Sequence, residues 1–384
     1  MRVGIGLCAE PDPGAGASIA AAQAARALGG AAPDLAVVFA SGEHLREPGA
    51  LLDAVREHLG SVALVGCGAG GVLGDGRELE SGTAVAIWAA ALDGASALPF
   101  RAHADGEGRI SLTDAPPLGR GDAVVLLCDP YTFHADALLE ELAVRAPGVP
   151  VLGGLSSGRT ADGEAALLID GEVVREGAVG LVLEGVETLP CVSQGAAPMG
   201  PEMTITAAEG NVIHELAGRP ALSAIEHAIG QLPASQRALV ARGLLIGIVI
   251  DAARPEYEQG DFLVRGVLGA DPRTGAVAVG APVQAGQVVR LHARDARSAD
   301  EDLRQALRLR AQALGGERPA GALVFSCNGR GRGMFGAADH DAAAVARELG
   351  GAPAAGFFAA GEIGPVGPRS FLHGFTATIA VFPR

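Results

Sequence analysis

Residues 321–336 read GALVFSCNGRGRGMFG, and the character of the chain changes in the middle of this stretch. Its first half is a short apolar run, which is typical of a buried β-strand. A thiol, an amide and two guanidinium groups then follow, separated by glycines: Cys327, Asn328, Arg330 and Arg332. Glycines leave backbone N–H groups open to a ligand. The stretch therefore predicts a strand that delivers polar groups to the edge of a sheet.

The same order of elements occurs three times, at a spacing of roughly 100 residues. Strands are expected at 35–40, 123–128 and 322–326, and each is followed by a polar loop, a helix, a second strand, a glycine loop and a last strand. The last strands share one pattern, in GTAVAIW, GAVGLVL and GFTATIA. We interpret these units as duplicated α/β modules that form two stacked mixed sheets flanked by helices. Chance similarity among segments rich in Ala, Gly and Val is the alternative.

Two of the expected helices are marked by the residues at their ends. The segment 18–30 is expected to start at Ser18, and the segment 298–316 opens with Ser298 and Glu301, which match a capping box. Both segments end at a Gly pair, which is a common helix stop.

The region 243–291 lacks a crossover helix and predicts an antiparallel meander with a turn at DPRTG. Pro220 precedes a segment that is suited to start a new helix. We therefore expect two domains, residues 1–218 and residues 219–384.

The composition limits the possible partners and chemistry. A formal net charge of −15 argues against nucleic acid and anionic membranes as partners. No apolar run approaches the ~20 residues of a membrane span, and the N-terminus MRVGIGLCAE does not read as a signal peptide. A cytoplasmic protein is expected. The chain has no lysine, so Walker-type phosphate loops and Schiff-base chemistry are excluded.

The cysteines and histidines predict neither a metal nor a cofactor. The five cysteines lie far apart and are odd in number, which argues against a disulfide framework and against a Cys-x-x-Cys metal site. No HExxH motif occurs among the nine histidines. GCGAGG (66–71) and GLSSG (154–158) match dinucleotide and serine-elbow patterns, but neither precedes a helix, so close backbone packing is the better interpretation.

Two loops of the third module are expected to meet. A right-handed crossover makes its two strands parallel, so their loops leave at the same edge of the sheet. Cys327, Asn328 and Arg330 should then face Glu362. Arginine suits a carboxylate and a glutamate suits an ammonium group, so a zwitterion such as an amino acid fits this set. A structural ion pair between Arg330 and Glu362 is the alternative.

Catalysis by Cys327 is a further possibility. A thiol near arginines at a strand end is suited to act as a nucleophile, with His373 as its base, in a hydrolase. Free cysteine also often only fills space in a core. We expect a binding protein rather than an enzyme, and a non-catalytic scaffold for protein partners is the third interpretation.

The chain resembles the FIST domain family over nearly its whole length. FSCNGRGRGMFG, GFFAAGEIGPVG and LHGFTATIAVF are similar to the C-terminal FIST domain, whereas ALVGCGAGGVLG, ESGTAVAIW and LLIDGEVVREGAVGLVLEG are similar to its N-terminal partner. The resemblance implies a bacterial, intracellular signal-transduction protein that senses a small ligand, with amino acids suggested. We expect an amino acid or a small carboxylate as the ligand, and a separate signalling protein partner or a change of assembly as the output. The family pattern matches this chain at four positions: Cys327, Arg330, Gly361 and Glu362. In the expected site, Asn328 assists Arg330, and the backbone of Gly68 and Gly70 adds contacts.

Overall fold

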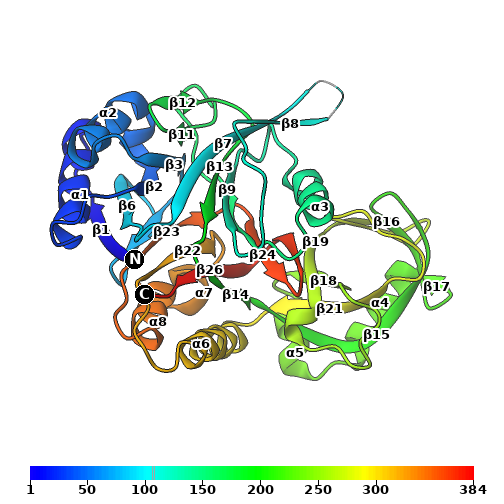
Figure 1. Ribbon diagram of the computed structural model, residues 1–384. Helices are drawn as coiled ribbons and strands as arrows, with labels where there is room; N and C mark the ends of the chain where they lie inside the picture. The colour runs from blue at the N-terminus through cyan, green and yellow to red at the C-terminus, as the bar shows by residue number, and fades with distance from the viewer. Residues whose placement is uncertain (106, 108) are drawn as a thin grey trace. The chain divides into compact units, whose positions relative to one another are not determined.

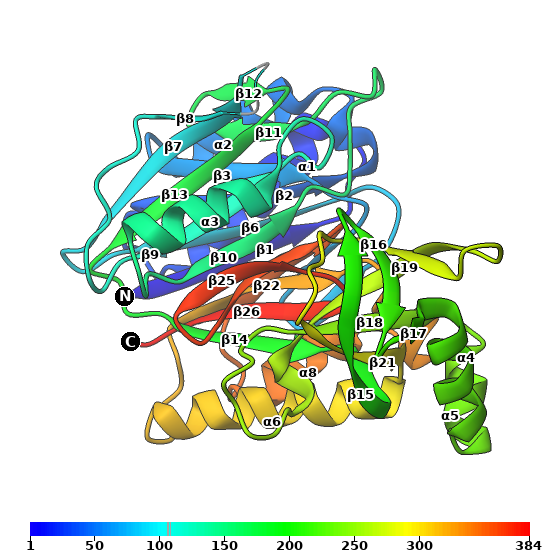
Figure 2. The same cartoon turned by 90° about the vertical axis from the view of Figure 1, so that its right-hand side faces the viewer.

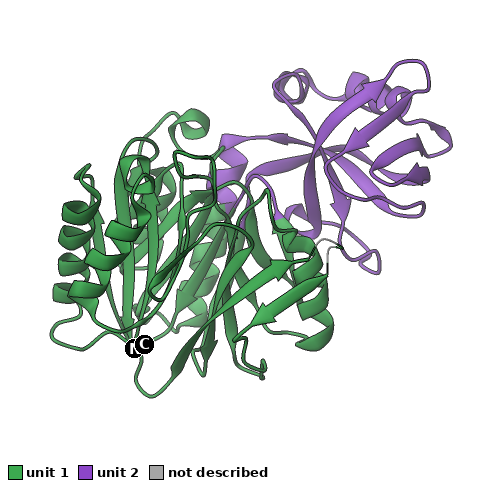
Figure 3. Ribbon diagram, turned by 90° about the horizontal axis from the view of Figure 1, so that it is seen from above, with its two compact units in different colours: residues 1–192, 303–372, 377–384 green, residues 193–302, 373–376 purple. Residues whose placement is uncertain are grey.

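The computed structural model describes residues 1–105, 107 and 109–384. The chain divides into two compact units, shown in Figure 3. The first unit comprises residues 1–192, 303–372 and 377–384, and the second comprises residues 193–302 and 373–376. Each unit is built from more than one segment of the chain, whereas the two domains that we expected, residues 1–218 and 219–384, are continuous. The expected domain boundary at residue 218 stays a prediction.

The first unit contains modules 1 and 2 and most of module 3, whose residues 193–194, 296–302, 373 and 376 belong to the second unit. The modules appear in Figure 1. Module 1 consists of β1 (Arg2–Cys8), α1 (Pro13–Ala27), β2 (Leu35–Ser41), η1 (Gly42–Leu45), α2 (Pro48–Leu59), β3 (Ala63–Gly68), β4 (Val72–Gly74), β5 (Arg77–Leu79) and β6 (Ala84–Ala91). Module 2 consists of β7 (Ser96–Ala104), β8 (Ile110–Thr113), β9 (Ala123–Cys128), α3 (Ala135–Arg145), β10 (Val151–Leu155), β11 (Leu167–Ile169), β12 (Glu172–Val174) and β13 (Ala178–Glu184). Module 3 consists of β14 (Leu189–Gln194), α6 (Ala296–Ala313), β22 (Gly321–Cys327), α7 (Arg332–Phe335), α8 (His340–Glu348), β23 (Ala354–Ala359), β24 (Glu362–Val366), β25 (Arg369–His373) and β26 (Thr376–Phe382).

The modules share one sheet topology. In each, the strands before and after the crossover are parallel neighbours: β2 with β3, β9 with β10, and β22 with β23. The last strand pairs antiparallel with the first of these, as β6 does with β2, β13 with β9 and β26 with β22. The prediction of repeated α/β modules with mixed sheets is therefore confirmed. There are three such sheets in this unit rather than the two that we expected.

Each module lends its central hairpin to the sheet of another module. The β4–β5 hairpin pairs with β23, where Leu73 lies opposite Gly356. The β11–β12 hairpin pairs with β3, and the β24–β25 hairpin pairs with β10. This cyclic exchange ties the three modules together through backbone hydrogen bonds, so none of the three sheets is complete without a second module.

The main core lies between the sheets. The sheets of modules 1 and 3 are stacked in Figure 2, with α1 and α2 outside one and α6 and α8 outside the other. Phe39 of module 1 stacks on Phe357 of module 3 with ring centroids 5.0 Å apart, and Trp88 lies 5.2 Å from Phe382. Burial of such large apolar side chains contributes about 1.5–3 kcal/mol each, so this layer is a major source of stability.

The starts of two helices differ from expectation. Helix α1 begins five residues early because the Asp12 side chain caps it and Pro13 occupies its first position. Helix α6 begins at Ala296, so the expected capping box is wrong. Ser298 instead donates to the side chain of Gln259 (3.0 Å), and Glu301 pairs with Arg297 (3.3 Å).

The second unit is the expected antiparallel meander with added strands and helices. It contains β15 (Ala196–Glu209), β16 (Val212–Leu216), β17 (Arg219–Pro220), α4 (Ala221–Gln231), α5 (Ala234–Val240), β18 (Leu244–Val249), η2 (Gln259–Asp261), β19 (Phe262–Asp271), β20 (Ala276–Val279) and β21 (Val288–Arg294). β18 and β19, and β19 and β20, are antiparallel, and the N–H of Gly275 donates to the carbonyl of Asp271 in the DPRTG turn (2.8 Å). Helix α4 follows Pro220 directly, as predicted. In the part of the chain that the structure describes, no helix is both long and apolar enough to cross a bilayer.

Candidate functional site

The two loops of module 3 leave the sheet at the same edge. β22 and β23 are parallel, and Cys327 lies opposite Ala359 at their carboxyl ends. The N–H of Asn328 donates to the carbonyl of Ala359 (2.9 Å), which fixes one loop to the other. Glu362 then opens β24 and is fully buried. The strand arrangement that was expected to place Glu362 near the Cys327 loop is therefore present.

Arg330 is held in a buried ion pair that the sequence analysis missed. Its Nε and Nη2 donate to the two carboxylate oxygens of Asp341 at 2.6 and 2.9 Å, and both side chains are 1% exposed. Asp341 also accepts a hydrogen bond from Ser326 Oγ (2.7 Å) and lies 2.9 Å from His340 Nδ1. Such a two-pronged pair fixes the plane of the guanidinium group.

The electrostatics of this pair favour the charged forms. Burial by itself acts to raise the pKa of Asp341, but the Arg330 guanidinium and the hydrogen bonds hold it well below its usual range. For Arg330, burial acts to lower the pKa, and the negative charge of Asp341 outweighs it, with further contributions from Cys327 and Glu362. The structure thus brings Cys327, Arg330 and Glu362 within electrostatic range of one another. Nη1 of Arg330 is also buried, and it has no hydrogen-bond partner among the residues described.

A carboxylate from module 1 caps the helix that carries Asp341. Glu78 lies in β5, and its Oε1 accepts from the backbone N–H groups of Asp341 (2.8 Å) and Ala342 (2.9 Å). In return, Asp339 Oδ1 accepts from the N–H of Glu78 (2.6 Å). Burial raises the pKa of Glu78 to about 7, with a further increase from the charge of Asp341, although the two N–H bonds oppose it. The hairpin exchange therefore places a group that titrates near neutral pH beside the Arg330–Asp341 pair.

The glycine loop and α7 form the exposed side of this cluster. Glu80, which directly follows the same exchanged hairpin, accepts the N–H of Arg332 at 2.8 Å. The Phe335 ring stacks on the His340 ring, with centroids 3.4 Å apart, and the guanidinium carbon of Arg330 lies 5.1 Å from the Phe335 centroid. Cation–π contacts of this kind stabilise the position of an arginine.

The hydrolase alternative rests on Cys327 and His373. Cys327 is 6% exposed, and its Sγ accepts the N–H of Gly329 at 3.4 Å. His373 ends β25 and is also buried, but it belongs to the second compact unit. A nucleophile–base pair between the two residues stays a prediction.

The glycines of the GCGAGG loop serve close backbone packing. A Cβ on Gly68 would lie 2.6 Å from the carbonyl oxygen of Gly158, and the N–H of Gly70 donates to Ser157 Oγ (2.9 Å). Ser157 Oγ in turn donates to the carbonyl of Phe358. Hydrogen bonds thus join the loops after β3 and β10 to the strand β23, and β4 rather than a helix follows GCGAGG. The assignment of Gly68 and Gly70 as ligand contacts stays a prediction.

Two other predicted positions also pack closely. A Cβ on Gly361 would lie 3.0 Å from Leu155 Cδ1, so a larger residue there would press on the end of β10. Ser156 Oγ donates to the carbonyl of Gly68 (2.6 Å), which explains the serine-elbow pattern as a structural contact.

Asp341 and Glu78 are the site residues that sequence reasoning missed. Asp341 stands in the first turn of an expected helix, and its spacing from Arg330 could have suggested a pair. Glu78 comes from a hairpin more than 250 residues away along the chain, and no local pattern links it to this site.

Comparison with known proteins identifies the family. Residues 34–219 match the FIST N domain, and residues 221–365 match the FIST C domain. The chain belongs to the FIST family. FIST domains are sensory domains of signalling proteins. This FIST chain is 44% identical over 384 residues to an uncharacterized protein of Mycobacterium bovis. The alignment covers 100% of this chain and 99% of the relative. It is 43% identical over 382 residues to an uncharacterized protein of Mycobacterium tuberculosis H37Rv, with 100% of both chains covered.

Proposed function

We propose that this FIST protein is a sensor whose small polar ligand binds beside Arg330. The observation that carries the proposal is Nη1 of Arg330, a buried donor without a hydrogen-bond partner among the residues described. Leaving such a donor unpaired costs about 1–3 kcal/mol, and a ligand oxygen would remove that cost. Because Asp341 already fixes the guanidinium plane, little ordering is needed when the ligand binds.

The charge balance of the cluster favours an amino acid over a simple carboxylate. Asp341 already neutralises Arg330, so a bare carboxylate gains only a hydrogen bond and little net attraction. Glu362 adds a second acidic group, which suits the ammonium group of a zwitterion. Asn328 is exposed and stands next to Cys327, where its amide N–H groups can donate to the ligand carboxylate.

A thermal-shift screen of the full chain against the common amino acids and small carboxylates tests this proposal. At 100 times its dissociation constant, a ligand adds about 2.7 kcal/mol to the free energy of unfolding. We expect an amino acid to raise Tm in the wild type, with the shift reduced in Asn328→Ala and abolished in Glu362→Gln. Arg330→Lys keeps a charge opposite Asp341 but removes the guanidinium fork, and it should also abolish the shift.

Arg332→Ala is the matched control, because Arg332 is an exposed arginine in the same loop and only its backbone is hydrogen-bonded to Glu80. It should retain the full ligand-induced shift. The proposal fails if no compound raises Tm, or if Arg330→Lys and Glu362→Gln respond as the wild type does. Rapid alkylation of Cys327 in a Cys8→Ser background, together with no ligand response, would instead favour the hydrolase.

A further inference from the structure

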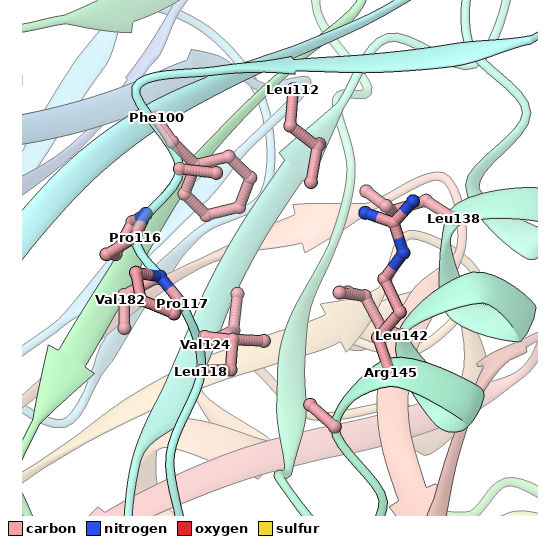
Figure 4. Close-up of a pocket in the computed structure, with 12 residues that line it drawn as sticks. Phe100, Leu112, Pro116, Pro117, Leu118, Val124, Leu138, Leu142, Arg145 and Val182 are labelled. Carbon is pink, nitrogen blue, oxygen red and sulfur yellow. The ribbon is translucent and has the colours of Figure 1, made fainter.

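Module 2 contains an apolar cavity of about 570 Å³, shown in Figure 4. It lies between helix α3, the strands β7 and β8, and the segment 114–118. Its lining includes Phe100, Leu112, Pro117, Leu138 and Leu142. Ligand pockets commonly measure ~300–1,000 Å³ and are mostly apolar, so this cavity has the size and surface of a binding site.

The cavity lies where the two other modules place a helix, because the described residues of module 2 between β7 and β9 form no helix. In modules 1 and 3 a long helix, α1 or α6, precedes the crossover and packs on the outer face of the sheet. Ala20 and Ala24 of α1 and Leu303 and Leu307 of α6 make that contact. In this position, the described residues of module 2 contain only β8 and the proline-containing segment 114–122. Helix α3 therefore covers only part of the sheet face at Val124, and the cavity lies beside the helix on the rest of that face.

One arginine lines the hollow, and a second lines an adjoining one. Arg145 lines the apolar cavity and also an adjoining cavity of about 340 Å³, which shares Leu118 and Ala146 and adds Arg120. Arg145 pairs with Glu141 on the same helix at 2.8 Å, but the arginine is 67% exposed, so this pair holds it weakly. Arg120 forms no ion pair within residues 1–105, 107 and 109–384. In a chain of net charge −15, a cation in the apolar cavity and another in the adjoining cavity are complementary to an anionic head group.

We propose that this cavity is a second ligand site, which binds an aliphatic carboxylic acid with its tail among the apolar side chains and its carboxylate at Arg145 and Arg120. At a volume share of about 30 Å³ per water-sized group, the 570 Å³ cavity holds roughly 19 such groups. An acid of roughly 8 to 12 carbons fits within it and leaves its head group at the arginines. This site is separate from the Arg330 cluster and does not depend on the function proposed for that cluster.

Calorimetric titration of the full chain with octanoate, decanoate, dodecanoate and decanol tests the proposal. Each buried methylene is worth about 0.8 kcal/mol, so affinity should rise about fourfold per carbon along the acid series. Decanoate should bind at least tenfold more tightly than decanol, because only decanoate carries a charge for the arginines. The absence of binding by all three acids would overturn the proposal.

Two variants locate the ligand, and two more are controls. Ala115→Trp fills the cavity from a half-buried loop position and should abolish decanoate binding. Arg145→Gln should weaken decanoate about tenfold and leave decanol unchanged. Glu141→Gln, the matched control on the same helix, frees Arg145 and should keep or tighten decanoate binding. Wild-type affinity in both Ala115→Trp and Arg145→Gln would overturn the assignment of this site, as would equal affinity of the wild type for decanoate and decanol. Asn328→Ala should leave decanoate binding unchanged, which separates this site from the Arg330 cluster.

Discussion

Replacing Glu78 by glutamine should remove a pH dependence from the stability of this protein. Glu78 is 8% exposed, and the pKa of its carboxyl is raised by burial from an ordinary value of 4.5 to about 7. The fold therefore favours the protonated form more than the unfolded chain does. The contribution of Glu78 to stability is fully present below pH 4.5 and is lost as the pH rises through about 7.

The size of the effect follows from the two pKa values. The difference between 4.5 and about 7 corresponds to about 3.4 kcal/mol at 1.36 kcal/mol per pH unit. Between pH 5 and pH 8 the part that is lost amounts to about 2.5 kcal/mol. Glutamine keeps an oxygen that can accept the N–H groups of Asp341 and Ala342, so the cap of α8 is preserved while the titration is removed.

Urea unfolding of the wild type and of Glu78→Gln at several pH values between 5 and 8 measures this difference. The free energy of unfolding of the variant should gain about 2.5 kcal/mol relative to the wild type across that range. Glu57→Gln, at an exposed position on α2, is the control and should show no such gain. Parallel pH profiles for the wild type and Glu78→Gln would refute the reasoning that burial outweighs the two N–H bonds.

Three further predictions concern the same unit. Asp341→Asn leaves the buried Arg330 without its counter-ion and should lower the free energy of unfolding by about 3–5 kcal/mol, measured by urea unfolding at pH 7. Gly356→Ala places a Cβ 1.7 Å from the carbonyl oxygen of Val324, so it should lower Tm or prevent folding, whereas alanine at the unobstructed Gly49 of α2 should not. Burial raises the pKa of the Cys128 thiol, so iodoacetamide at pH 7.5 should leave this residue unmodified in the native state and label it after unfolding in urea, as mass spectrometry would show.

The repeated modules could be predicted from the sequence because their signals are local. Apolar runs, glycine stops and a matched order of elements depend on neighbouring residues, and they predicted β22, β23 and the parallel pairing between them. The polar loop that starts at Cys327 was also found in this way. Helix starts were less reliable, because the side chain of Asp12 competes with that of Ser18 as the cap of α1.

The exchange of hairpins and the partners of Arg330 were decided only by the tertiary structure. β4 pairs with a strand from the other end of the chain, and a strand that is apolar on both faces carries no mark of which sheet it completes. Glu78 reaches α8 only through that pairing. The amino-acid sequence determines by itself which residues form strands and which loops carry polar groups. The long-range backbone pairing decides which of those groups share a site and which of them titrate near neutral pH, because burial and neighbouring charge are properties of the assembled fold.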